Sequence, residues 1–302
     1  MLYSLCKFFL RYPAEMRDEN GSFGIFMFSV SLVTYRNQFA DIKDLINSVL
    51  ESSCSCFYIV DNANDPVLAK EISALQNDRI KYVPMSENRG FGSGHNAAIK
   101  KSMSEGCDYH MIMNPDIKFD PGTLEKIEMF MESDKEIGLV MPKTLFPDGL
   151  LQRNCKLVPA PADLIFKRFF PEFLVRFRMK RFMMCDYDHD AVLDVPYLCG
   201  CFMAFRCSVL NKTGIFDERF FMYPEDIDIT RRIFSAGWRT VYYPGAEVIH
   251  EHNRESGKNM RMLWIHIVNM IRYFNKWGWI FDPERKKINK RIVELNKDKL
   301  LR

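Results

Sequence analysis

The stretch Met111-Ile-Met-Asn-Pro-Asp-Ile-Lys-Phe119 decides the fold. An apolar run that stops at a polar tip is typical of a buried strand that delivers side chains to the edge of a sheet. Open α/β sheets bind ligands just outside the carboxyl ends of their strands, so the carboxylate of Asp116 is placed to hold a metal-bound phosphate. Because Asn, Pro and Asp all favour turns, the alternative is that residues 114–116 form only a loop.

Strands and helices alternate on both sides of this stretch. Apolar runs and helical spacing predict strands at 28–35, 56–60, 79–83, 137–141, 199–205 and 240–243, and helices at 40–50, 67–76 and 122–133. This alternation predicts parallel βαβ units with right-handed crossovers. The sheet is therefore expected to present Thr34, Asp61 and residues 114–116 along one edge. Asp61, at its strand end, suits either a turn or a hydrogen bond to a nucleobase or ribose.

A glycine-rich segment, residues 87–98, lies between the third strand and the next helix. Gly90, Gly92 and Gly94 allow the backbone to approach a ligand closely, and the helix offers free N–H groups to an anion. The G-x-G-x-G spacing after the third strand differs from a dinucleotide fingerprint, which argues against a Rossmann dehydrogenase. The alternative is a glycine-rich turn that caps a helix.

Two acids open a predicted helix, because Glu225 and Asp226 directly follow a proline. They would lie at the positive end of the helix dipole, which favours an ionised carboxylate ready to accept a proton. The alternative is that both acids only cap the helix. Asp228 is expected to form an ion pair on the helix surface, because Arg231 and Arg232 follow at three and four residues.

Two histidines, His250 and His252, lie near the end of the last apolar stretch, residues 246–252. Residues two apart on a strand face the same way, so both imidazoles can reach one metal ion. An ordinary surface pair of histidines is the alternative.

The composition is that of an ordinary globular protein, with 302 residues, 47% of them hydrophobic and 27% charged. A net charge of +3 argues against a dedicated nucleic-acid binder. The nine cysteines are scattered and the chain shows no secretory signal, so reduced, buried thiols in a cytoplasmic protein are expected. Cys54-x-Cys56 and Cys199-x-Cys201 lack zinc-knuckle spacing, which favours core packing for both pairs.

Two segments, residues 166–184 and 262–279, interleave aromatic, apolar and basic side chains. Such a mixture suits a surface that lies against anionic lipid headgroups, as in a protein bound peripherally to the inner face of the cell membrane. Helices packed on the main domain, with the stems of Lys and Arg covering apolar surface, explain it as well. No apolar run approaches the ~20 residues needed to span a bilayer.

Seven motifs follow one another along the chain. They are residues 30–37, Val60-Asp61-Asn62, Asn88-Arg-Gly-Phe-Gly-x-Gly-x-Asn96, Met113-Asn-Pro-Asp116, Cys199-Gly-Cys-Phe-Met-Ala204, Phe216-Asp-Glu-Arg-Phe-Phe-Met-Tyr-Pro-Glu-Asp226 and Val248-Ile-His250. The motifs and their order resemble those of the family 2 glycosyltransferases, and more narrowly of their bacterial rhamnosyltransferase-like branch. The match covers roughly residues 28–280, and seven ordered motifs are more specific than any one of them.

The resemblance implies a GT-A fold, an α/β fold with a mostly parallel central sheet flanked by helices, and transfer of a sugar from a nucleoside diphosphate with inversion. Asp226, in its pair with Glu225, would be the general base. His250 would join Asp116 in holding Mg²⁺ or Mn²⁺, although Asn114 replaces the first aspartate of the family's DXD-type motif and leaves one fewer charged ligand. The expected donor-binding residues are Thr34, Tyr35, Asp61, Asn62, Asn88, Gly90, Asn96, Asn114 and Asp116.

The expected organisation is an extension at 1–26, a catalytic domain at 27–255 and a C-terminal amphipathic helical segment at 256–302. Within the catalytic domain, residues 27–120 would bind a dTDP- or UDP-sugar and residues 121–255, with a basic and aromatic insertion at 160–190, would bind a glycan or lipid-linked acceptor. Two other classes stay open, a nucleotidyltransferase and a non-catalytic nucleotide-sugar-binding protein. The absence of glycine in Thr34-Tyr-Arg-Asn-Gln38 counts against the first.

Overall fold

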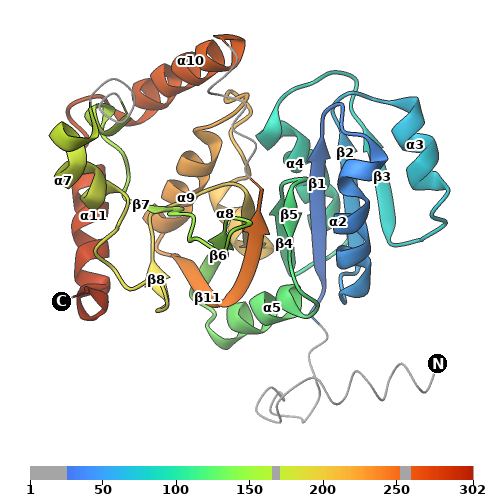
Figure 1. Cartoon of the computed structure of the whole chain (residues 1–302), viewed down its shortest axis with the longest axis horizontal. Helices are drawn as coiled ribbons and strands as arrows, with labels where there is room; N and C mark the ends of the chain where they lie inside the picture. Colours follow the sequence, from blue (N-terminus) through green and yellow to red (C-terminus); the bar gives the residue numbers. More distant parts are fainter. Residues whose placement is uncertain (1–25, 165–170, 252–259, 302) are drawn as a thin grey trace.

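The computed structural model describes residues 26–164, 171–251 and 260–301. Its central feature is a mixed sheet flanked by helices (Figure 1). The neighbours across the sheet are β3 (Ile80–Pro84), β2 (Cys56–Asp61), β1 (Phe28–Thr34), β4 (Tyr109–Met113), β10 (Phe202–Arg206), β6 (Ile137–Leu145), β11 (Arg239–His250) and β5 (Ile117–Lys118), with β8 (Leu193–Asp194) added on β11.

The first half of the sheet follows the predicted βαβ pattern. β1, β2, β3 and β4 are parallel, and the connecting helices are α2 (Phe39–Glu51), α3 (Pro66–Ser73) and α4 (Phe91–Ser104). In the register of β1 and β2, Thr34 lies opposite Asp61, and β4 ends directly before Asn114. The predicted common edge for these three residues is therefore confirmed.

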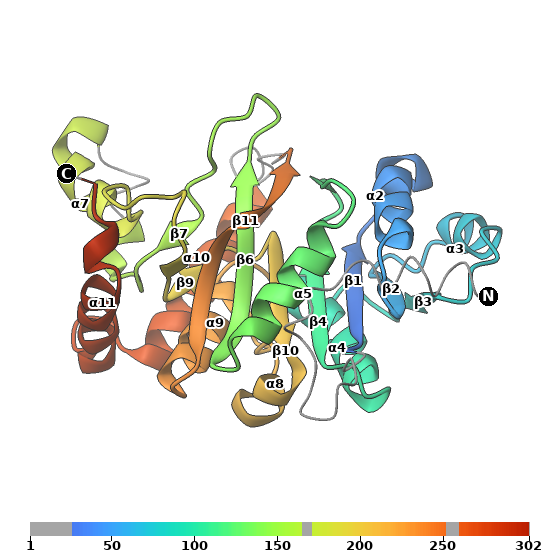
Figure 2. The same cartoon turned by 90° about the horizontal axis from the view of Figure 1, so that it is seen from below.

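β10 gives the sheet its mixed character, because it runs antiparallel between β4 and β6 (Figure 2). After β6 the chain makes a long excursion and returns at the edge where β4 ends, so Phe202 pairs with Met113. Residues 199–201, which were expected to begin a buried strand, lie instead just before it, at the same edge as Asn114. The last strand is also longer than predicted, since β11 continues through a register shift between Tyr243 and Glu247.

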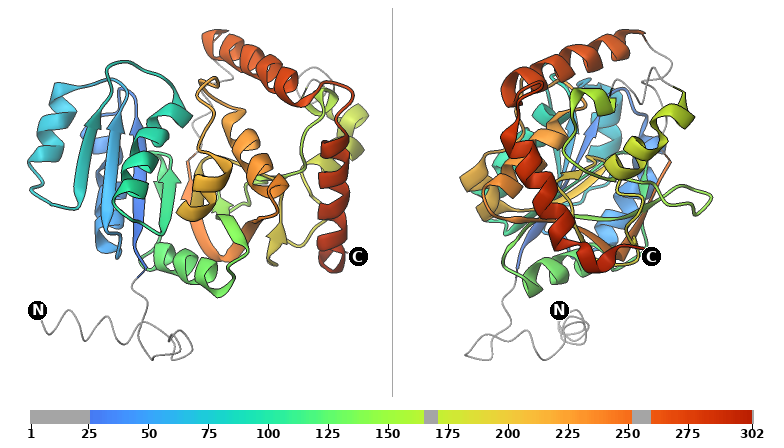
Figure 3. Two further views of the ribbon diagram at one scale, coloured as in Figure 1. Left: turned by 180° about the vertical axis from the view of Figure 1, so that it is seen from behind. Right: turned by 90° about the vertical axis from the view of Figure 1, so that its left-hand side faces the viewer.

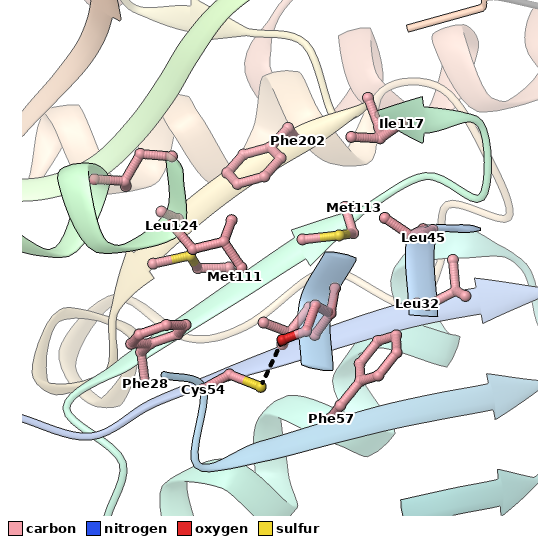
Figure 4. Close-up of a cluster of buried hydrophobic side chains, with 14 of the residues drawn as sticks. Phe28, Leu32, Leu45, Cys54, Phe57, Met111, Met113, Ile117, Leu124 and Phe202 are labelled. Carbon is pink, nitrogen blue, oxygen red and sulfur yellow. Dashed lines mark hydrogen bonds between the residues drawn. The ribbon is translucent and has the colours of Figure 1, made fainter. Parts of the chain in front are cut away.

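Helices cover both faces of the sheet, and successive strand residues alternate between the two cores. Met111 and Met113 pack with α2, α3 and α5 (Thr123–Ser133), in the cluster drawn in Figure 4. Ile112 packs on the opposite face, with α4, α8 (Cys207–Thr213), α9 (Glu225–Ser235) and α11 (Pro283–Leu295). Each large apolar side chain buried in this way contributes roughly 1.5–3 kcal/mol to stability, so the two cores stabilise the strands that end at the ligand edge.

The region from 146 to 201 contains little regular structure. Its elements are β7 (Cys155–Lys156), which pairs with β9 (Tyr197–Leu198), then α7 (Glu172–Phe182), and the short β8, which pairs with β11. α7 forms within the basic and aromatic segment, and Phe173, Leu174 and Phe177 are exposed on it. Residues 165–170 of that segment lie outside the described residues.

The C-terminal region is helical, as expected, with α10 (Met260–Trp277), α11 and the short 3₁₀ helix η3 (Lys297–Lys299). α10 lies over α9 as the outermost element on its side (Figure 3). None of the helices in the described parts of the chain is both long and apolar enough to span a bilayer. The predicted extension at 1–26 falls, apart from Phe26, outside the described residues, as does His252.

Candidate active site

Asp61 ends β2 and is fully buried. One carboxylate oxygen accepts hydrogen bonds from Thr34 Oγ1 (3.2 Å) and Ala63 N (2.9 Å), and the other accepts from Asp65 N (2.7 Å) and the Tyr82 hydroxyl (2.8 Å). Four donors occupy the four lone-pair positions of a carboxylate. Asp61 therefore organises the turn after β2, and its predicted contact with a nucleoside stays a prediction that requires one of these donors to move.

Asn62, at the same strand end, has a buried polar atom without a hydrogen-bond partner in the part of the chain that the structure describes. Its Nδ2 donates to the carbonyl oxygen of Gly90 (3.2 Å), whereas its buried Oδ1 has no hydrogen-bond partner among the described residues. A buried acceptor without a donor is costly unless a ligand or water satisfies it. Tyr35, which follows Thr34, is exposed, and Asn88 Oδ1 accepts a hydrogen bond from Gly90 N (3.0 Å).

The glycine-rich segment packs against protein rather than lying open to an anion. Gly90 has φ = +91°, and a Cβ placed there would lie 2.0 Å from the carbonyl oxygen of Phe221. Gly92 and Gly94 lie inside α4, close to the side chains of Phe216 and Val33. The first N–H of α4, on residue 91, already donates to Phe221 O (3.0 Å). The glycines therefore bring α4 close to the loop that precedes the Glu225-Asp226 pair.

Asn96 has the same packing role. Its Nδ2 donates to Phe216 O (2.9 Å) and Glu218 Oε1 (3.1 Å), and its Oδ1 accepts from Phe216 N (3.0 Å). The side chain is buried and its hydrogen-bonding capacity is used by these partners. Its predicted contact with a donor stays a prediction.

Asn114, Asp116 and His250 converge where β4 ends beside the end of β11. His250 Nε2 lies 3.3 Å from Asp116 Oδ1 and 3.3 Å from Asn114 Nδ2. A carboxylate and an imidazole are suitable ligands for Mn²⁺, and the carboxylate for Mg²⁺. Within the described residues no third carboxylate, thiolate or imidazole groups with them to form a metal site. A cation bound here would take its remaining ligands from the substrate and water.

Asp226, in the first turn of α9, is nine-tenths buried. Its Oδ2 accepts the backbone N–H of Gly200 (3.1 Å) and its Oδ1 accepts that of Ile227 (2.8 Å). Burial raises the pKa of this carboxyl, whereas the ammonium group of Lys156 and the two N–H donors lower it, and the net shift is upward. A carboxylate with a raised pKa that still keeps donors for its charged form is suited to proton transfer near neutral pH.

Glu225 is still more buried, and its Oε2 has no partner among the described residues. Burial raises its pKa, and repulsion from Asp226 raises it further. The two carboxyls therefore differ in proton affinity, and Glu225 holds a proton more tightly than Asp226 does.

The predicted ion pair of Asp228 with Arg232 is confirmed, but its predicted place on the helix surface is wrong. Asp228 is fully buried, because α10 covers this side of α9, and its partners are Arg232 (2.8 Å), Lys276 (2.6 Å) and Trp277 Nε1 (2.8 Å). Arg231 instead forms a buried bidentate pair with Asp282, at 2.7 and 2.8 Å.

The segment from Cys199 to Cys201 joins the two halves of the site. Asn114 N donates to Cys201 O (2.9 Å), and the adjacent Gly200 donates to Asp226. A Cβ placed on Gly200 would lie 3.5 Å from the ring of Phe91, at the start of α4. Asn114 and Asp226, far apart in sequence, are therefore held by consecutive residues of one segment at the ligand edge.

Sequence reasoning missed two polar residues, Gln152 and Lys156. Gln152 Oε1 lies 3.0 Å from His250 Nδ1, and Lys156 donates to the Cys199 thiol (2.9 Å) beside Asp226. Both lie in the stretch where the apolar pattern loses its period, so no spacing assigned them to a strand end.

Residues 29–214 match the family described as Glycosyl transferase family 2. The chain is 26% identical over 194 residues to the N-acetylglucosaminyl-diphospho-decaprenol L-rhamnosyltransferase of Mycobacterium tuberculosis, which covers 60% of this chain and 61% of that protein. It is 28% identical over 193 residues to the rhamnosyltransferase WbbL of Escherichia coli, covering 61% and 69%. The match thus spans about three fifths of the mycobacterial relative.

Two solved structures share the fold. GalNAc-T7 with UDP, GalNAc and Mn²⁺ superposes with a TM-score of 0.63 at 13% identity, over 86% of this chain and 50% of that one. The mannosyltransferase PcManGT from Pyrobaculum calidifontis, in complex with GDP-Man and Mn²⁺, superposes with a TM-score of 0.57 at 17% identity, over 97% and 76%. The predicted GT-A fold is confirmed, and with a family match over more than half its length this chain belongs to glycosyltransferase family 2.

Proposed function

We propose that this protein transfers a hexosyl group from a nucleoside diphosphate to an acceptor hydroxyl, with inversion at the anomeric carbon. The observation that carries the proposal is the attachment of Asn114 and Asp226 to the consecutive residues Cys201 and Gly200. This attachment supports the proposal because it holds Asn114, next to the residues proposed to bind metal and phosphate, near the partly desolvated carboxylate of Asp226. Family membership supports the same reaction class.

Asp226 is the proposed general base. Inversion by a single displacement needs one base on the acceptor hydroxyl, whereas retention by double displacement also needs a nucleophile from the enzyme. The hydrogen bonds from Gly200 and Ile227 hold the carboxylate in one orientation. Glu225, with its more strongly raised pKa, stays protonated beside it and limits the negative charge in the pocket.

The proposed donor half is residues 27–120. Asn62 Oδ1 is the acceptor that a nucleobase or ribose donor group would satisfy. Thr34, whose carbonyl oxygen accepts from Asn62 N (2.9 Å), Tyr35 and Asn88 are the other proposed residues of this half. Two relatives are named as rhamnosyltransferases, and the solved neighbours contain UDP or GDP-Man. On this basis dTDP-rhamnose and UDP-hexoses are the first donors to test.

A divalent cation, Mg²⁺ or Mn²⁺, is proposed to bind at Asp116 and His250. When bound, it would neutralise negative charge on the leaving nucleoside diphosphate. Asn114 contributes a neutral side chain where an aspartate would add charge, so metal affinity is expected to depend strongly on the two remaining protein ligands. Both solved neighbours contain Mn²⁺.

The proposed acceptor is a lipid-linked glycan presented at an anionic membrane, with the protein bound peripherally to the inner face. α10 exposes Met260, Trp264 and Ile271, and Ile280 and Phe281 are exposed just after it. Residues 260–302 carry eleven Lys and Arg against four Asp and Glu, although the whole chain is only +3. Rings that enter the interface beside cations at lipid phosphates are the usual composition of such a surface.

The experiment begins with thermal-shift measurements of nucleotide sugars with and without Mn²⁺, because a ligand of the native state raises its apparent stability. The donor that binds is then incubated with a polyprenyl-diphospho-N-acetylglucosamine acceptor, and the products are analysed. A glycosyltransferase releases nucleoside diphosphate and makes a linkage of inverted configuration. In a separate incubation with a nucleoside triphosphate and a sugar 1-phosphate, release of inorganic diphosphate would support a nucleotidyltransferase instead. Binding of the nucleotide sugar without any released product would support a non-catalytic module.

A further inference from the structure

Gln152 lies behind His250, on the side away from Asp116, and its side chain is buried. Its Nε2 lies 2.6 Å from the carbonyl oxygen of His250 and 3.3 Å from that of Leu145. Carbonyl oxygens only accept hydrogen bonds, so the amide NH₂ must face them. The orientation of the amide is therefore fixed, and Oε1 is the atom that faces His250 Nδ1, at 3.0 Å.

This orientation decides the tautomer of His250. Because an amide oxygen cannot donate, Nδ1 must carry the proton, and in a neutral imidazole Nε2 is then left with a lone pair. That lone pair lies 3.3 Å from Asp116 Oδ1, which also only accepts when it is ionised. Asn114 Nδ2 can donate to Nε2, at 3.3 Å, and neither Nε2 nor the ionised carboxylate oxygen of Asp116 brings a proton to the contact between them. Two electron pairs thus meet at a position that suits a cation.

We infer that Gln152 is a positioning residue that locks His250 as the Nδ1–H tautomer and so prepares Nε2 to bind the divalent cation. The inference rests on the proposed metal site of the transferase. Outer residues that bond the second nitrogen of a ligating histidine fix the ring and raise its basicity, and their loss typically costs 10–100-fold in metal affinity. Gln152 does this without adding a charge beside Asp116.

The tautomer is measured on the metal-free, full-length protein by long-range ¹H–¹⁵N NMR of the imidazole nitrogens, at a pH of about 8 where an unperturbed imidazole is neutral. Six histidines give signals, and loss of one set in His250→Gln assigns His250. The wild type is expected to show the Nδ1–H tautomer. An Nε2–H tautomer at His250 would overturn the inference, and this result needs no variant of Gln152 to fold.

Metal affinity is then measured by calorimetry with Mn²⁺ alone. Gln152→Met keeps the size of the side chain but cannot accept from Nδ1, so a 10–100-fold weaker affinity is expected. Gln152→Glu keeps an acceptor for Nδ1 but sets its second oxygen against the carbonyl oxygens of His250 and Leu145, so it should keep the tautomer while lowering the free energy of unfolding. Thr144→Val is the control, because Thr144 is buried near Gln152 and its hydroxyl bonds to Pro142 O (3.3 Å) and to the Cys201 thiol.

Wild-type failure to bind Mn²⁺, or unchanged affinity in Gln152→Met, would refute the inference. Neither result touches the proposed transfer reaction, which is read from the released nucleoside diphosphate. Conversely, a locked tautomer and tight Mn²⁺ binding in a protein that transfers no sugar would refute the proposed function and leave the role of Gln152 intact.

Discussion

The backbone N–H of Gly200 lies 3.1 Å from Oδ2 of Asp226, and a Cβ placed on Gly200 would lie 3.3 Å from Asp226 Cβ. The backbone N–H of Gly200 therefore orients the carboxylate of Asp226, and the two segments that carry these residues are in close contact. Because residue 201 accepts from Asn114, the same segment fixes the distance between the proposed base and the phosphate side of the site. Small movements of residues 199–201 should therefore change the rate of sugar transfer before they change the free energy of unfolding.

Lys156 is predicted to set the acidic limit of activity. Its positive charge lowers the pKa of Asp226, which burial raises, so Lys156→Met should raise that pKa further. A base is active when deprotonated, so activity is lost as pH falls through this pKa. The acidic limb of the kcat/KM profile should therefore move to higher pH by on the order of one unit.

The control for this profile is Lys143→Met, which removes an ammonium group that pairs with Asp190 and Glu247 away from the site. Lys143→Met should leave the acidic limb of the kcat/KM profile at the wild-type pH. A Lys156→Met enzyme with an unshifted limb, or one shifted to lower pH, would show that Lys156 does not act on the base.

The buried pair between Arg231 and Asp282 is predicted to hold the C-terminal helices on α9. Both side chains are almost fully buried, and the guanidinium also stacks on Trp277 at 4.1 Å. Removing one partner of a buried pair leaves an uncompensated charge, so Arg231→Met should lower the free energy of unfolding by roughly 3 kcal/mol. Chemical denaturation measures this change.

The double variant Arg231→Met/Asp282→Leu should recover part of the loss, because the unpaired carboxylate is gone. Arg219→Met, which breaks an exposed pair with Asp217, should cost less than about 1 kcal/mol. Equal effects of Arg231→Met and Arg219→Met would contradict the proposed role of the buried pair.

Glu128 is predicted to destabilise the protein as pH rises. It is buried in α5 with its Oε2 unpartnered among the described residues, and burial raises its pKa to about 8. Above pH 4.5 the unfolded chain ionises this group while the folded protein keeps it protonated, so folding loses free energy between pH 4.5 and 8. Glu128→Gln removes this cost and should add up to about 3 kcal/mol at pH 7.

Urea denaturation at several pH values tests this prediction. The gain in free energy of unfolding from Glu128→Gln should shrink towards zero near pH 4.5. Glu136→Gln, at an exposed position just after α5, is the control and should show no such trend. A gain that is constant with pH would mean that packing, not ionisation, explains the effect.

The exposed apolar face of α10 and its following turn is predicted to bind anionic vesicles. Trp264→Ser/Phe281→Ser removes two exposed rings, so it should reduce co-flotation with phosphatidylglycerol vesicles at low salt several-fold. Val67→Ser, at an exposed apolar site on α3, is the control and should float like the wild type. A wild-type protein that stays unbound would refute membrane attachment.

The ligand edge was predictable because parallel βαβ units place successive strand ends together. Thr34, Asp61 and Asn114 each follow an apolar run, and their common edge needs no knowledge of the loops. What sequence did not indicate is how the carboxylates are used. Asp61 has the position of a ligand residue, yet Tyr82, from a strand 21 residues later, helps to occupy its oxygens.

The acceptor side was less predictable, because its contacts come from segments without periodicity. Helical spacing correctly paired Asp228 with Arg232, but only α10 decides that the pair is buried. The glycines of residues 90–94 indicated close approach of the backbone, and the structure shows that the partner is the protein itself. The places of Gln152 and Lys156 at the site can be recognised only once the structure shows that β10 returns to the edge where β4 ends.

The central claim is that Asp226 is the general base of sugar transfer. The most direct test is the rate of nucleoside diphosphate release and acceptor glycosylation by Asp226→Asn, with donor binding followed in parallel by thermal shift. The account predicts that transfer falls by at least about 100-fold, the lower range for loss of a general base, while the donor still binds. Transfer at close to the wild-type rate would contradict it.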